Sequence, residues 1–131
     1  MFAVFVAAVF IVVSAVQAFD LQWFGQSAFK IVTPGGKVIF IDPFITNNPK
    51  TPKEFKDLQK LGRVDLILVT HGHGDHIGDT AQISKTTGAK VAMNADMGNT
   101  FAALGWVPYN RLLRFNKSGP IKPLGDANQL E

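Results

Sequence analysis

Apolar residues occur in short runs along the chain, and the turn residues between them predict several strands. Strand-like content occupies residues 21–25 and 28–33, and Pro34, Gly35 and Gly36 connect the second run to residues 37–41 as a hairpin. The uninterrupted apolar run over residues 38–41 is typical of a strand that is covered on both faces. The first part of the chain is therefore expected to contribute an antiparallel hairpin to a larger sheet.

The later part of the chain alternates predicted strands with predicted helices. Glycines stand at the expected helix ends, at Gly62, Gly88 and Gly105. Strand alternating with helix indicates the α/β class. The predicted elements, in order, are a helix over 54–61, a strand over 66–69, a helix over 77–87, a strand over 90–93, a helix over 95–104 and a strand over 111–115.

The first eighteen residues read as an export signal. Residues 1–13 are almost wholly apolar, and small residues at 16–18 suit cleavage before Phe19. No Lys or Arg precedes the run, so an uncleaved membrane anchor is the rival interpretation, and a long buried strand is a third. We expect a mature domain over residues 19–131 that is exported to the periplasm or outside the cell, with membrane anchoring as the alternative.

Composition indicates one globular domain. The 131 residues are 47% hydrophobic and 18% charged. The net charge of +3 is not concentrated in a Lys/Arg run, so no nucleic-acid partner is expected. The chain has no cysteine, which excludes disulfides and thiolate metal ligands.

All three histidines lie within residues 70–76, directly after the predicted strand over 66–69. In extended backbone His71 and His73 project to the same side, and the intervening glycine leaves room for a cation. Asp75 and His76 are neighbours and are expected to diverge from that pair, toward a second cation. A lone loop histidine is usually a surface group, but three with an interposed carboxylate favour metal binding, and zinc accepts both ligand types.

The pattern His71-x-His73-x-Asp75-His76 resembles the signature of the metallo-β-lactamase superfamily. The segments 23–31, 36–44 and 64–70 are similar to its poorly characterised metal-dependent hydrolase branch, and the resemblance covers residues 20–126. It implies the amino-terminal half of an αββα sandwich. The uncovered face of such a half-sandwich is expected to favour self-association.

The resemblance also implies a chemistry and a set of roles. Two divalent cations, expected to be zinc with manganese or iron left open, would activate a water molecule for hydrolysis. His71 and His73 would hold the first cation, and Asp75 with His76 the second. Asp75 would be catalytic, orienting the water and helping to handle its proton. The small-molecule substrate stays open, since relatives hydrolyse lactams, thioesters, lactones and phosphodiesters.

Asp42 ends the strand over 37–41 and precedes a proline, so a turn-forming role is one interpretation. The resemblance implies another, in which Asp42 supports the histidine loop without binding metal. Gln26 departs from similar sequences, which commonly have histidine at this position. Glutamine forms hydrogen bonds but does not titrate near neutrality.

The second departure is that relatives complete the site with two further histidines and an acidic residue downstream, which this sequence lacks. Three hypotheses follow: the amino-terminal part of a hydrolase, inactive alone; a non-catalytic metal-binding remnant; or a membrane-anchored interaction protein. Met93, Met97, Phe101 and Trp106 are expected in the core rather than in a substrate pocket.

Overall fold

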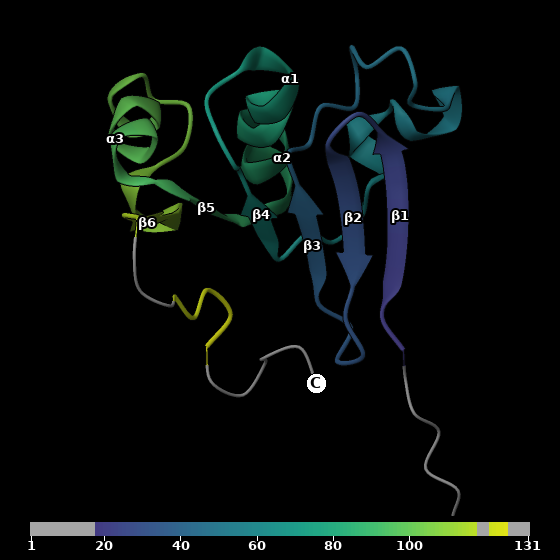
Figure 1. Ribbon diagram of the computed structural model, residues 1–131, viewed down its shortest axis with the longest axis horizontal. Coiled ribbons are helices and arrows are strands. Elements are labelled where there is room, and N and C mark those ends of the chain that lie inside the picture. Colours follow the sequence, from purple (N-terminus) through teal and green to yellow (C-terminus); the bar gives the residue numbers. More distant parts are fainter. Residues whose placement is uncertain (1–17, 118–120, 126–131) are drawn as a thin grey trace, which may run out of the picture.

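One six-stranded mixed sheet organises the protein (Figure 1). The computed structural model describes residues 18–117 and 121–125. The strands follow one another across the sheet in sequence order; β1, β2 and β3 pair antiparallel, and β3 to β6 pair parallel. The α/β fold expected from the sequence is confirmed. The strands are β1 Asp20–Gly25, β2 Ala28–Val32, β3 Val38–Ile41, β4 Leu66–Leu68, β5 Lys90–Asn94 and β6 Leu112–Phe115.

The helices occupy the connections between the parallel strands. Because parallel connections are right-handed and β3 to β6 advance in one direction, successive crossovers fall on the same face of the sheet. Accordingly α2 packs against β5, and α3 packs against β5 and β6. The helices are α1 Gly74–Ile77, α2 Thr80–Thr87 and α3 Ala95–Ala103, with 3₁₀ helices η1 Lys53–Phe55, η2 Leu58–Lys60 and η3 Tyr109–Arg111.

One helix prediction was wrong because the expected helix is broken in two. The helix expected over residues 54–61 is η1 followed by η2, and extended Asp57 separates them while its carboxylate accepts from the Gln59 N–H at 3.1 Å. The helix expected over 77–87 is α2, which begins three residues later, at Thr80, because Gly78 ends the short helix α1 and Asp79 precedes α2. Gly88, in left-handed backbone, ends α2 as predicted.

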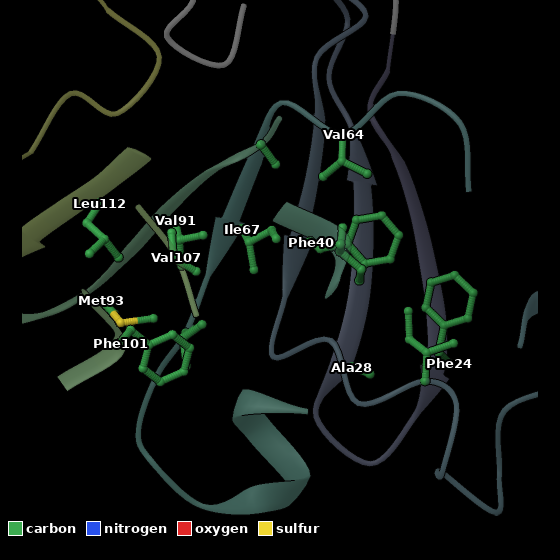
Figure 2. Packing of buried hydrophobic residues seen from close by; sticks show 14 residues of the cluster. Phe24, Ala28, Phe40, Val64, Ile67, Val91, Met93, Phe101, Val107 and Leu112 are labelled. Atoms are coloured by element: carbon green, nitrogen blue, oxygen red, sulfur yellow. The ribbon is translucent and has the colours of Figure 1, made fainter. Parts of the chain in front are cut away.

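The main core lies between the sheet and the helices (Figure 2). It extends from Phe24 on β1 across the sheet to Leu112 on β6. Met93 and Phe101 belong to this core, as the sequence predicted, and Met97 packs against it while partly buried. The prediction was wrong for Trp106, which keeps 46% of its surface exposed.

The other face of the sheet is also apolar. Side chains alternate between the two faces along a strand, and residues that pair across neighbouring strands lie on the same face. One continuous surface on this face is marked by the pairs Leu21–Ile31, Ile31–Ile39, Leu66–Lys90 and Ala92–Leu113. At its centre Ile39, Leu66 and Ala92 are buried with Leu124 packed against them. At its β1 end Leu21 and Trp23 are 58% and 61% exposed. We call this surface the far face.

Self-association through the far face stays a prediction, and residues 19–131 alone provide its test. We expect this polypeptide to sediment as a dimer or larger species, and Trp23→Lys to shift it toward monomer, because a charge on an apolar interface must be desolvated. Tyr109→Lys is the matched control, since Tyr109 is 59% exposed in η3. A wild-type polypeptide that sediments as a monomer would contradict the expectation.

The predicted export signal and the domain boundary before residue 19 fall on or beside residues 1–17, which lie outside the described residues. Among the helices that the structure describes, none has the length and apolar character needed to span a bilayer.

Candidate metal centre

The predicted site residues gather at one edge of the sheet. Parallel strands β3, β4 and β5 all end there, so Asp42 and Thr70 follow the ends of β3 and β4, next to Asn94 at the end of β5. The turn containing Gln26 lies at the same edge, because Phe29 near the start of β2 pairs with Ile41 at the end of β3. Gln26 itself is exposed, and its carbonyl accepts from the Trp23 indole N–H at 2.9 Å.

His71 and His73 converge, as their spacing predicted. Their ring centroids are 4.6 Å apart, and His71 Nε2 lies 3.1 Å from His73 Nδ1. Two nitrogens bound to one tetrahedral zinc at about 2.0–2.1 Å would be about 3.3 Å apart. The observed separation is within a few tenths of an ångström of that value. These two nitrogens therefore suit a single cation.

His76 does not diverge from this pair, contrary to the expectation. Its ring centroid lies 3.9 Å from that of His71. The expectation assumed extended backbone throughout the loop, whereas α1 begins at Gly74 and its turn brings His76 back over His71. Asp75 is more open than His76, with 50% of its side-chain surface exposed against 16%, and its Oδ2 lies 3.7 Å from His76 Nε2.

Asp42 anchors the histidine loop through its buried carboxylate. Its side chain is 2% exposed; Oδ1 accepts from the Thr70 N–H at 2.8 Å, and Oδ2 accepts from the Thr70 hydroxyl at 2.7 Å. Oδ2 also lies 2.8 Å from His76 Nδ1. The structure thus places Asp42 in the supporting position that the family resemblance implied.

These contacts decide which imidazole nitrogens carry a proton and which keep a lone pair. A carboxylate only accepts, so Nδ1 of His76 carries the proton that Asp42 receives, and Nε2 is left with its lone pair. The Thr70 hydroxyl gives its own proton to Asp42, so it accepts from His71 Nδ1 at 3.0 Å. His71 and His76 both keep Nε2 available for a metal, as partner groups commonly arrange for ligating histidines.

The backbone also requires a short polar residue at position 42. Asp42 has φ of 44°, in the left-handed region where Asp and Asn are tolerated far better than other non-glycine residues. Its N–H donates to the Leu68 carbonyl at 2.9 Å. This conformation turns the chain sharply after β3 and directs the carboxylate toward the loop that follows β4.

Thr70, Gly78 and Asp79 were missed as site residues by the sequence reasoning. Asp79 Oδ2 accepts from the backbone N–H groups of residues 45 and 46 at 2.7 and 2.9 Å, and the Asp79 N–H donates to the Pro43 carbonyl at 2.7 Å. The segment after Asp42 is thereby tied to the segment after His76. The available signal was that Gly78 and Asp79 directly follow the histidine pattern.

The donor set fits a divalent metal in its chemistry but is incomplete in number. Within residues 18–117 and 121–125, no group of three or more His, Cys, Asp or Glu side chains is placed to hold one ion. The His71–His73 pair supplies two ligands, whereas a catalytic zinc typically takes three protein ligands and a water. This loop can therefore form one side of a metal centre.

The mixed sheet with the histidine loop at its strand ends can be compared with known families. The sequence profile of the metallo-beta-lactamase superfamily matches residues 21–128. The chain belongs to this superfamily.

Individual relatives agree with that assignment. A UPF0173 metal-dependent hydrolase of Cupriavidus taiwanensis is 51% identical over 108 residues, covering 82% of this chain and 38% of that protein. One of Thermodesulfovibrio yellowstonii is 45% identical over 96 residues, covering 73% and 36%. The solved structure of Igni18, a metallo hydrolase from Ignicoccus hospitalis, matches with a TM-score of 0.68 and 36% identity, covering 79% of this chain and 42% of that one. The chain thus spans well under half the length of these relatives.

Proposed function

We propose that this chain contributes one side of the dinuclear zinc centre of a metal-dependent hydrolase. The observation that carries the proposal is the convergence of His71 and His73 on a loop anchored by buried Asp42. The relatives named as metal-dependent hydrolases support the reaction class. Zinc is proposed because imidazole nitrogens and a carboxylate oxygen suit it.

In the proposed centre His71 Nε2 and His73 Nδ1 bind the first cation, and His76 Nε2 with Asp75 binds the second. When bound, the metal would activate a water molecule for hydrolysis at neutral pH. Asp75, exposed and next to His76, would orient that water and take up its proton. Asp42 and Thr70 hold the imidazoles in the orientation and tautomer that ligation requires.

The remaining ligands are proposed to come from a second half-domain outside these 131 residues. The support is twofold: the described residues supply no three-ligand group, and the named relatives are more than twice as long as the part that this chain matches. The far face provides the surface on which such a half would pack. On this proposal the 131 residues bind metal without turning over substrate alone.

A non-catalytic metal-binding remnant is the second candidate function. The specific observation that favours it is again the two-ligand pair, which can hold a cation weakly without a fixed water. Both candidates require the loop to bind metal, so metal binding is the first property to measure.

Zinc binding at equilibrium, measured by dialysis, tests the proposal. We expect the 131-residue chain to bind zinc and the zinc affinity to fall about tenfold or more in His71→Ala and in His73→Ala, because each removes one of two converging ligands. Asp75→Asn should also lower zinc binding, because Asp75 is a proposed ligand. Its matched control is Asp96→Asn, a carboxylate change at the start of α3 that should leave zinc binding unaltered. Equal zinc in the wild type and both histidine variants would overturn the proposal.

A further inference from the structure

An apolar groove runs beside the histidine loop. It encloses about 370 Å³, within the range of small-molecule sites. It lies between the loop with α1 on one side and α3 on the other. Its apolar surface comes mainly from Ile77, Met97, Phe101, Leu104 and Trp106, with Gly72 in its wall.

Gly72 makes the groove continuous with the candidate metal centre. It stands between His71 and His73, and a Cβ added there would lie 3.4 Å from Met97 Sδ. The backbone of the metal loop is therefore in van der Waals range of the groove. A substrate bound at this centre would have the apolar surface beside it.

The groove is kept open by a rigid turn after α3. Gly105 adopts φ of 68°, and the Trp106 N–H donates to the Phe101 carbonyl at 2.9 Å. The Trp106 ring meets the Phe101 ring edge to face at 5.0 Å between centroids. Leu104 and Trp106 consequently remain 55% and 46% exposed beside the site, although both are large apolar residues. Exposed apolar side chains grouped along a groove mark a binding surface.

We propose that this groove binds an uncharged aliphatic chain of the substrate, next to the bond that is cleaved. The inference rests on the proposed function and adds the chemical class of the group that is recognised. An uncharged chain is favoured because Asp96, the charged residue among those lining the groove, is an exposed carboxylate that would repel an anion. Aliphatic carbons would replace water on Leu104, Met97 and Trp106.

Trp106 fluorescence provides a test that does not depend on metal or turnover. The protein has two tryptophans, so Trp23→Phe leaves Trp106 as the reporter. We expect octanamide, titrated into this 131-residue variant with EDTA present, to change the emission saturably. Adding Leu104→Ser should weaken binding about tenfold by removing apolar surface that the bound chain would cover.

Leu21→Ser is the matched control, because Leu21 is exposed to the same extent as Leu104, 58% against 55%, but lies on β1. It should leave the octanamide titration unchanged. Because Leu104 is largely exposed, its serine variant is expected to fold, and an unchanged far-ultraviolet circular dichroism spectrum checks this. Absence of a saturable change, or equal weakening by both serine variants, would overturn the groove assignment. Zinc content of the His71→Ala protein tests the proposed function separately.

Discussion

Replacing Asp42 by alanine is expected to lower the free energy of unfolding by about 3 to 5 kcal/mol. The variant leaves the Thr70 N–H, the Thr70 hydroxyl and His76 Nδ1 without the carboxylate that they contact at 2.7–2.8 Å, inside a site where Asp42 is 2% exposed. It also places alanine, which has no polar side chain, in left-handed backbone at φ of 44°. Urea unfolding followed by circular dichroism measures the change.

Asp42→Asn separates the contribution of Asp42 to stability from its contribution to zinc affinity. Asparagine tolerates the left-handed backbone and keeps one acceptor oxygen for Thr70, so we expect about a third of the alanine effect on stability. It does not reproduce both acceptor oxygens for Thr70 and His76, so zinc affinity should fall by about 10- to 100-fold. An alanine variant with wild-type stability and wild-type zinc affinity would show that Asp42 does not anchor the loop.

Gly78→Ala is expected to destabilise the protein by about 2 to 3 kcal/mol. A Cβ at this position would lie 2.7 Å from both Phe44 Cα and the Pro43 carbonyl oxygen. Both contacts are to backbone, so no side-chain rotation relieves them. The displacement would separate Asp79 from the segment after Asp42, and zinc binding should weaken together with stability.

Gly74→Ala is the matched control for this prediction. Gly74 begins α1, and an added Cβ would meet nothing within 4 Å. Alanine is the better helix former, so the variant should be as stable as the wild type or slightly more stable. Urea midpoints of the two variants, measured side by side, check the contrast. If both glycines tolerate alanine equally, the close packing of Gly78 against residues 43 and 44 is refuted.

The sheet could be predicted from sequence because its signals are local. Apolar runs bounded by turn residues located all six strands to within one or two residues, and Gly88 correctly marked the end of α2. The break between η1 and η2 and the late start of α2 were harder to predict. Gly78 precedes α2 and lies against the backbone of residues 43 and 44, and that contact is non-local.

The site was partly predictable because some of its signals are also local in the sequence. The convergence of His71 and His73 follows from their spacing, and the family resemblance identified Asp42. The position of His76 depends on where α1 begins and on the contact with Asp42, 34 residues earlier in the chain. Trp106 was misassigned to the core because composition does not reveal that the turn at Gly105 holds it at a groove.

X-ray absorption at the zinc edge of the zinc-loaded protein tests the central claim most directly, since it reports the atoms around the metal. We expect a nitrogen and oxygen shell at about 2.0–2.1 Å with outer-shell scattering from imidazole rings. That outer-shell signal should decrease in His73→Ala and disappear when His71, His73 and His76 are all replaced. A spectrum without imidazole scattering, identical in the wild type and the triple variant, would show that the histidine loop does not bind the metal.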